Sequence, residues 1–526
     1  FDFAGYIPVQ TSSKSGYLSV NSETAPGGVV ILDIEFDDSI GKWQLDRSQG
    51  VDFPISFIPG STQTFATISN CSGTVTPWGT VITCEETTSI ETEAYCQNPN
   101  NAESFRWIYF GEKDNNGDGY DDFGWAIEID PVTKTVINQE GGRTDKDKLW
   151  AMGNFKHENA VVRADHRTVY QGADATYKNE ETKEGDGYLF KFVASRRDTL
   201  SQGDLYVYKG DKVNNHEWVK LANDTPSEQN STIAQCKTLG ATAFGGIEDV
   251  EINPKDSLVY FTVKREIFGD INKKGVIYRF NDSSSGITDF EIYAGGNSVY
   301  NGVEWGEGND NLVFDDLGNL WVAQDGGNNY IWVVENGHTQ ANPKAKIFAR
   351  TPGGSEPTGL TFSPDFRYIF MSIQHPRNNN SAQTDVFGRA VDFNSDVVLV
   401  LARNEHLNNN LTTADQDIMI SQYYHDESTN SKWIEVKNIS GKPVTAGSYF
   451  LDLYDSADLE DIAAAEPKAS QAVPALEIDE VVLFKNSESP ASPLAENLGD
   501  AEQIPVSYTH LTLPTTLKSW WGGGGG

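Results

Sequence analysis

The stretch Lys255-Asp-Ser-Leu-Val-Tyr-Phe-Thr-Val263 joins a short polar turn to an apolar run that carries aromatic residues. This arrangement is typical of a tight turn that leads into a β-strand. Four further stretches have the same pattern, and the later copies begin roughly 50–60 residues apart, about the length of one propeller blade with its loops. These four copies are Asp165–Tyr170, Gly203–Tyr208, Asp316–Ala323 and Pro364–Met371.

The repeats predict an all-β protein, since helical periodicity is scarce along the chain. We expect a β-propeller, with six blades, whose loops converge on a central channel suited to a binding site. A row of β-sandwiches is the alternative. The composition agrees with a β-rich extracellular protein, because the 526 residues include 11% aromatics and 48 Gly but only 3 Met.

The charge balance narrows the range of partners. The chain has 76 Asp and Glu against 40 Lys and Arg, a net charge of −36. Such a surface repels nucleic acids and anionic membranes, so we expect no nucleic acid partner. No apolar run is long enough to span a membrane. Excess carboxylate suits calcium, which prefers oxygen ligands, although a solvated acidic surface explains the bulk charge equally well.

The sequence changes character near residue 400. We expect the propeller to occupy residues 1–403, a polar linker to follow at 404–417, and a second β-domain to occupy 418–505. Residues 506–526 end in a run of glycines without folding logic, and we expect a disordered or artefactual tail there. The chain begins at Phe1 rather than Met, which we interpret as a mature or trimmed start.

The second β-domain resembles a lamin-tail domain. The resemblance rests on Trp433-Ile-Glu-Val-Lys-Asn-Ile-Ser-Gly441 and on the Tyr-x-Leu pair that begins at Tyr449. It covers about 70 residues and implies a small immunoglobulin-like β-sandwich, which stops short of a complete domain.

The most informative motif is Asn70-Cys-Ser-Gly-Thr-Val-Thr-Pro-Trp-Gly-Thr-Val-Ile-Thr-Cys-Glu-Glu86. Its pattern of Asn-Cys-x-Gly, Thr-Pro-Trp-Gly-Thr and Thr-Cys-Glu-Glu resembles the signature of the PhoX family of bacterial alkaline phosphatases. The resemblance implies that Cys71 ligates iron and that Glu85 or Glu86 holds metal. Thiolate and carboxylate are suitable iron ligands, whereas a lone buried cysteine is more often structural. We interpret Cys84 as structural.

Other segments between about residues 65 and 400 carry the same resemblance. Gly153-Asn-Phe-Lys-His-Glu158, after the strand Gly124–Pro131, implies that Glu158 is an iron ligand. Gly172-Ala-Asp174 implies a metal-binding or supporting role for Asp174. The segments that end at Asp325 and begin at Ser355 imply metal roles for Asp325 and Glu356, although Asp325 could be a plain turn residue.

One segment departs from the family pattern. Phe244-Gly-Gly-Ile-Glu-Asp matches the family's Arg-Pro-Glu-Asp segment and implies that Glu248 binds calcium and acts at the catalytic site. The family's arginine, expected to grip phosphate, falls on Gly246. Because a guanidinium is a bidentate phosphate clamp, its loss is chemically important. Lys264 or Arg265, just past the next strand, is our candidate for its replacement, and we assign the catalytic role to Lys264.

A further motif is independent of the family. Asp114-Asn-Asn-Gly-Asp-Gly-Tyr-Asp-Asp122 places oxygen atoms at alternate positions around glycines, which suits a calcium loop. No helix or bidentate Glu follows at EF-hand spacing, so a plain acidic turn is the alternative. The expected ligands of this structural calcium loop are Asp114, Asn116, Asp118, Asp121 and Asp122.

The resemblance implies a phosphatase that uses Fe(3+) and Ca(2+) to hydrolyse small-molecule phosphate esters, without a serine nucleophile. We expect a monomer that is secreted, periplasmic or on the cell surface. Two alternatives remain. The first is a calcium-dependent lactonase or diesterase, for which Cys71 would be dispensable. The second is a non-catalytic binding propeller, which the glycine at 246 favours and the retained carboxylates oppose.

Overall fold

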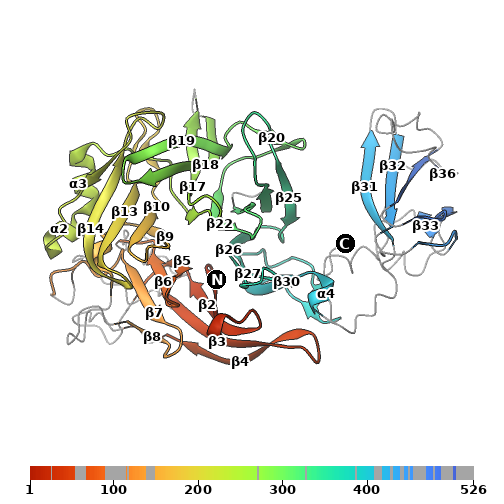
Figure 1. The fold of residues 1–526 in the computed structure, drawn as a ribbon, viewed down its shortest axis with the longest axis horizontal. Helices are drawn as coiled ribbons and strands as arrows, with labels where there is room; N and C mark the ends of the chain where they lie inside the picture. Colours follow the sequence, from red (N-terminus) through yellow and green to blue (C-terminus); the bar gives the residue numbers. More distant parts are fainter. Residues whose placement is uncertain are drawn as a thin grey trace. The chain divides into compact units, whose positions relative to one another are not determined.

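The computed structural model shows a β-rich chain (Figure 1). It divides into two compact units, the first formed by Phe1–Phe36, Trp43–Ser381 and Phe393–Leu401, and the second by Asp37–Lys42, Ala382–Asp392 and Ala402–Gly526. The structure describes residues 1–24, 27–51, 53, 67–88, 114, 118–137, 148–268, 272–325, 329–385, 388–407, 418–426, 431–438, 443–447, 450–453, 469–477, 480–486 and 502–504.

The first unit is a six-bladed β-propeller built from antiparallel sheets that follow one another along the chain. Blade 1 contains β1 (Ala4–Pro8), β2 (Ser15–Ser22), β3 (Gly28–Asp37) and β4 (Lys42–Gly50). Blade 2 contains β5 (Asn70–Val75), β6 (Val81–Glu85), β7 (Ala126–Asp130) and β8 (Thr135–Val136). Blade 3 contains β9 (His157–Val162), β10 (Thr168–Ala173), β13 (Leu189–Arg196), β14 (Thr199–Lys209) and β15 (Glu217–Lys220).

The remaining blades follow the same plan. Blade 4 contains β16 (Val250–Ile252), β17 (Val259–Phe268), β18 (Asn272–Ser283) and β19 (Gly286–Gly295). Blade 5 contains β22 (Asn309–Phe314), β23 (Leu320–Gln324), β24 (Tyr330–Val334) and β25 (Ala345–Arg350). Blade 6 contains β26 (Glu356–Phe362), β27 (Tyr368–Gln374) and β30 (Val397–Ala402).

Both units also contain short helices and hairpin strands. They are η1 (Val9–Thr11), η2 (Trp150–Met152), α2 (Pro226–Asn230), α3 (Thr232–Leu239), α4 (Asn404–Leu407), and the hairpin strands β11 (Tyr177–Asn179), β12 (Glu184–Gly185), β20 (Val299–Tyr300), β21 (Val303–Glu304), β28 (Gln383–Thr384) and β29 (Ala390–Val391). The expected linker at 404–417 therefore begins with α4, and its residues from 408 onward lie outside the described part of the chain. No described helix is long and apolar enough to cross a membrane.

The second unit contains two further sheets. One consists of β31 (Ile418–Asp426), β32 (Ser431–Asn438), β35 (Val481–Asn486) and β36 (Glu502–Ile504), and the other pairs β33 (Phe450–Leu453) with β34 (Ala469–Ala472). Residues 433–438 of the lamin-tail-like stretch lie in β32, which pairs with β31 and β35. That this unit is a lamin-tail domain stays a prediction.

Four of the five repeated stretches form the same part of a blade. They supply the turn before the second strand of blades 3 to 6, namely β10, β17, β23 and β27. The turn expected at Gly203 is wrong, because Gly203 lies inside β14 and pairs with Ala194. Glycine is needed there because a Cβ atom would lie 2.4 Å from the carbonyl oxygen of Val193. Close packing, rather than a turn, therefore explains this glycine.

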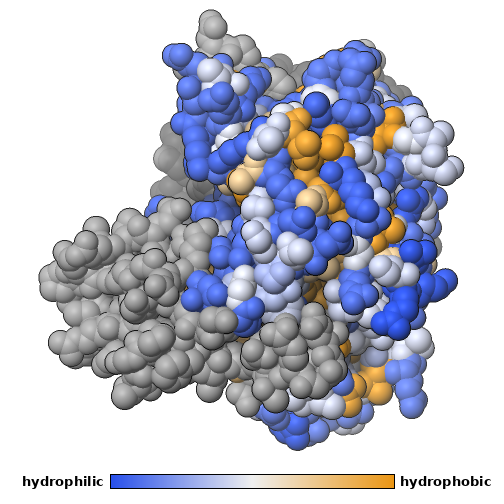
Figure 2. Space-filling view, turned by 90° about the vertical axis from the view of Figure 1, so that its left-hand side faces the viewer, coloured by the Kyte–Doolittle hydropathy of each residue, from blue (hydrophilic) through white to orange (hydrophobic). Residues whose placement is uncertain are grey.

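The hydrophobic core lies between blades. Separate clusters of buried residues join blades 1 and 2, 2 and 3, 3 and 4, 4 and 5, and 5 and 6. Between blades 1 and 6, Tyr6 stacks on Phe370 with ring centroids 4.8 Å apart. On the face of the molecule shown in Figure 2, hydrophilic residues predominate around a smaller group of hydrophobic ones. Each blade is thus held by its neighbours through apolar contacts.

A buried carboxylate adds a polar link between blades 3 and 4. Asp282, at the end of β18, is 4% exposed. Its Oδ2 accepts hydrogen bonds from the hydroxyl of Tyr170 at 2.7 Å and from Nζ of Lys191 at 2.8 Å. Its Oδ1 accepts one from Nε1 of Trp218 at 3.2 Å. Three strands of blade 3 therefore converge on one side chain of blade 4.

We expect Asp282→Ala to lower the free energy of unfolding by about 3 kcal/mol, because it leaves the partly buried ammonium of Lys191 and the buried hydroxyl of Tyr170 without their partner. Urea denaturation followed by circular dichroism measures the change. Asp289→Asn is the control, since Asp289 is exposed on β19 of the same blade and should change stability by less than about 0.5 kcal/mol. Equal, small losses for both variants would contradict the proposed link.

Candidate active site

One face of the propeller collects acidic side chains from every blade. Because neighbouring strands are antiparallel, the start of each innermost strand lies beside the end of the second strand of its blade. For example, Glu356 at the start of β26 pairs with Gln374 at the end of β27. Asp2, Cys71, Glu158, Glu248, Asp310 and Glu356 lie at or just before the starts of the innermost strands. Glu23, Glu86, Asp174, Asp325 and His375 lie at the ends of the second strands, while Lys264 lies within β17, where the pairing with β18 shifts register.

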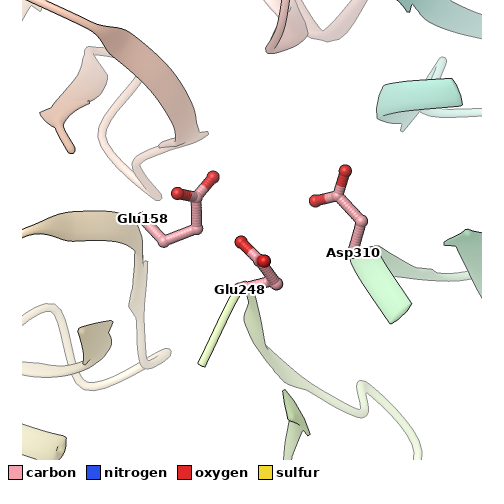
Figure 3. A group of neighbouring side chains, drawn as sticks. All are labelled: Glu158, Glu248 and Asp310. Atoms are coloured by element: carbon pink, nitrogen blue, oxygen red, sulfur yellow. The ribbon is translucent and has the colours of Figure 1, made fainter. Parts of the chain in front are cut away.

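Three carboxylates of the inner set form a compact group. Glu158 on β9, Glu248 just before β16 and Asp310 on β22 each offer an oxygen, and these oxygens lie within 4.8 Å of one another. All three residues are buried. Figure 3 shows the three side chains converging from three consecutive blades. We call them the carboxylate triad.

The pKa values of all three carboxyl groups in the triad are raised, because nearby positive charge does not compensate for burial and mutual repulsion. The pKa of Glu158 is raised well above its usual range, mainly by burial and then by the neighbouring carboxylates of Glu248 and Glu86. Burial and then Glu356 do the same for the pKa of Asp310. The pKa of Glu248 rises to about 8 through burial and Asp174, against the attraction of Lys264. Buried carboxylates in this state favour a bound cation.

The acidic region extends beyond the triad. Burial, Asp325 and Glu23 raise the pKa of Glu356 to about 7. The pKa of Glu86 is raised mainly by burial and then by Asp174. Asp2 is buried, and burial followed by Glu23 raises its pKa. Asp325 follows β23, where its backbone N–H donates to the carbonyl of Gly308 at 2.8 Å.

Lys264 supplies positive charge within this acidic region. Its Nζ lies 2.5 Å from Oδ2 of Asp174 and also pairs with Oε1 of Glu248. Burial opposes the charged form, but Glu248 and Asp174 outweigh it and raise the pKa of Lys264. The side chain keeps 25% exposure. An ammonium has three N–H donors, so one remains after these two pairs.

Cys71 lies beside the backbone of Glu158, one member of the triad. It is 1% exposed, and its Sγ lies 3.1 Å from the carbonyl of His157 and 3.6 Å from that of Glu158. Burial and then Glu158 and Glu86 raise the pKa of the Cys71 thiol. Cys84 is also buried, and its backbone carbonyl accepts from Cys71 Sγ at 3.5 Å. The structure thus brings Cys71 together with Glu158 and Glu86.

Glu85 and Glu86, which the sequence could not separate, have different surroundings. Glu85 is fully buried and pairs with Nζ of Lys148 at 2.6 Å. It also accepts hydrogen bonds from Thr67, Ile68, Gly124 and Trp125. These contacts occupy both of its oxygens with structural partners. Glu86, whose neighbours are Asp174, Glu23 and Glu248, is the one that faces the acidic region.

Two histidines near the site differ in exposure. His157 is buried, its ring stacks on Phe155 at 3.6 Å, and its Nε2 contacts the carbonyl of Gly153 at 2.9 Å. Burial lowers its pKa to about 3, so it is neutral and supports the loop before β9. His375 is exposed at the end of β27.

The acidic loop at 114–122 is partly described. The carboxylates of Asp114 and Asp118 accept backbone N–H groups of Gly119 and Tyr120, each at 2.9 Å. Asp121 and Asp122 are largely buried. Asn116 lies outside the described residues. The calcium loop therefore stays a prediction.

Sequence reasoning missed three acidic residues of the site. Asp310 lies in the segment that ends at Asp325, between Asn309 and Asn311. An Asn-Asp-Asn sequence is typical of a turn, so the local pattern offers no reason to assign Asp310 to the site. Asp2 and Glu23 belong to blade 1, whose sequence carries little family resemblance. Their places follow only from ring closure, in which Thr358 Oγ1 of blade 6 donates to Asp2 Oδ1 at 2.6 Å.

The donor set fits a bound metal. Carboxylate oxygens from three blades meet within 4.8 Å, which suits a hard divalent cation, and a thiol lies behind one of them. The buried carboxylates need positive charge beyond that of Lys264 to be ionised together.

Comparisons with known proteins identify the fold and the family. Among curated proteins none matches the chain. PhoX of Pseudomonas fluorescens, solved in complex with vanadate, a transition state analogue, is 21% identical over 77% of this chain and 88% of that chain, with a TM-score of 0.54. A gluconolactonase of Xanthomonas campestris is 11% identical over 70% of this chain and 92% of that chain, with a TM-score of 0.29.

The first of these structures shows that the fold is shared, while the second is too distant to carry an argument. The family model described as alkaline phosphatase PhoX matches residues 56–377, which is more than half of the chain and includes the triad, Cys71, Glu86 and Lys264. The chain therefore belongs to the PhoX family of alkaline phosphatases, enzymes that hydrolyse phosphate esters.

Proposed function

We propose that this phosphatase hydrolyses small phosphate monoesters at an iron–calcium centre held by the carboxylate triad and Cys71. The observation that carries the proposal is the convergence of Glu158, Glu248 and Asp310 within 4.8 Å, with the Cys71 thiol behind Glu158. Pseudomonas fluorescens PhoX binds vanadate, a transition state analogue, which is consistent with phosphoryl transfer on this fold.

The residues divide by the metal that their chemistry suits. Cys71 and Glu158 would hold iron, because a thiolate is a soft ligand that selects transition metals. The oxygen donors would hold calcium, which prefers carboxylates. When bound, such metals neutralise the phosphate and activate an oxygen nucleophile. The proposed calcium ligands are Glu86, Glu248, Asp310, Asp325 and Glu356.

Lys264 is the proposed phosphate-binding residue. Asp174 and Glu248 take two of its N–H donors and fix its position, which leaves the third donor for a phosphate oxygen. Its raised pKa keeps the ammonium charged at alkaline pH. Since Glu248 contacts Lys264 and also belongs to the triad, it couples substrate binding to the metal centre. A fixed cation of this kind stabilises the charge of the transition state.

Location and the second unit belong to the same proposal. A net charge of −36 and a chain rich in aromatics and poor in Met are consistent with a secreted, periplasmic or cell-surface enzyme that acts as a monomer. The β31–β32–β35–β36 sheet is consistent with a lamin-tail-like domain.

We expect Cys71→Ala to lose iron and to lower turnover of p-nitrophenyl phosphate by more than about 100-fold, because removing a metal ligand should cost more than the 10–100-fold typical of supporting residues. Elemental analysis and a turnover assay in calcium buffer measure both effects. Cys84→Ala is the matched control and should keep its iron. Calcium without iron and no phosphate release in the wild type would favour a lactonase or a binding propeller instead.

The triad has its own test. Asp310→Asn should reduce bound divalent metal and lower turnover by about 100-fold or more, since an amide oxygen is neutral and binds calcium more weakly than a carboxylate. Isothermal titration with calcium and the same turnover assay detect the two losses. Asp316→Asn, in the exposed turn between β22 and β23, is the charge-matched control. Metal binding that survives in Asp310→Asn would place the centre elsewhere.

A further inference from the structure

Gly246 creates the space in which the side chain of Lys264 lies. A Cβ atom built on Gly246 would lie 3.1 Å from Cγ and 3.2 Å from Cε of Lys264, and 2.6 Å from Oδ1 of Asp174. Gly246 also has a φ of +91°, which other residues rarely adopt. A side chain at position 246 would therefore clash with Oδ1 of Asp174 and crowd the stem of Lys264 in its present place.

The backbone fixes Lys264 at this position. Its N–H donates to the carbonyl of Gly246 at 3.0 Å, and its own carbonyl accepts from Gly308 at 3.0 Å. The β17–β18 pairing shifts register between Val263 and Glu266, so the irregularity includes Lys264. Such irregularities re-aim side chains in sheets. Lys264 is thus anchored to blades 4 and 5 rather than attached at one flexible end.

The ammonium lies where a metal shared by its two partners would have to lie. Nζ is 2.5 Å from Oδ2 of Asp174 and is also paired with Glu248, and calcium–oxygen distances are about 2.3–2.6 Å. Two cations cannot share this position. The other oxygen of Asp174, Oδ1, is buried beside Gly246 and has no hydrogen-bond partner among the described residues.

We propose that Lys264 permanently replaces one metal ion of the centre, so that no metal bridges Asp174 and Glu248. This inference rests on the proposed function, because it assumes that the triad binds metal. Asp174 is then a partner of the ammonium and not a metal ligand, while Glu248 uses its second oxygen in the triad. A covalently attached cation cannot dissociate, so this side of the centre stays charged when calcium is scarce.

The test is a metal count. Wild type and Lys264→Gln, each equilibrated with calcium and desalted, are compared by elemental analysis per chain. Removal of the ammonium frees two carboxylates, and we expect Lys264→Gln to bind about one more calcium ion per chain. Lys264→Arg keeps a cation and should match the wild type. Lys346→Gln, an exposed lysine on β25, controls for net charge and should also match the wild type.

A second variant decides the case if Lys264→Gln folds poorly. Asp174→Asn should keep the wild-type metal count, because its partner is the ammonium. Loss of an ion in Asp174→Asn, or an unchanged count in a folded Lys264→Gln, would overturn the inference. Either result would leave the proposed function standing if the wild type holds metal and releases phosphate. A wild type without metal would overturn both.

Discussion

Repulsion among buried carboxylates is the constraint on which this structure depends. At separations near 4.8 Å each pair of ionised carboxylates repels by about 3 kcal/mol at an effective dielectric constant of about 20. Three such pairs in the triad approach the whole stability of a typical protein, which is about 5–15 kcal/mol. The fold can keep these groups together only as protonated acids or around cations. The raised pKa values of Glu158, Glu248 and Asp310 express this condition.

The rigid packing of the propeller blades offsets this repulsion. Apolar clusters between blades and polar links such as Asp282 hold the innermost strands in place, so that side chains from separate blades stay converged despite their repulsion. Ring closure matters in the same way. Thr358 binds Asp2 and so brings blade 1 against blade 6, which completes the acidic face.

The sequence predicted the parts of the structure that depend on local pattern. The turn-and-strand stretches predicted four equivalent blade strands. The motif from Asn70 to Glu86 indicated a site, which stays a prediction. The sequence could not decide whether Glu85 or Glu86 faces the site, because the surroundings of Glu85 depend on Lys148 and four other donors elsewhere in the chain. Asp310 was missed because only its approach to blades 3 and 4 distinguishes it from a turn residue. Both distinctions depend on contacts between residues that are distant in sequence, and a local sequence pattern does not show such contacts.

The role of Gly246 also becomes clear only from its surroundings in the structure. Along the sequence, glycine in place of the family's arginine indicates the loss of a phosphate ligand. In the folded protein, the absence of a side chain at position 246 leaves room for Lys264, whose ammonium pairs with Asp174 and Glu248. The exchange is not neutral, because an ammonium offers a point charge where a guanidinium offers a planar pair of donors. The proposed site therefore retains positive charge, while the proposed contact with phosphate has a different geometry.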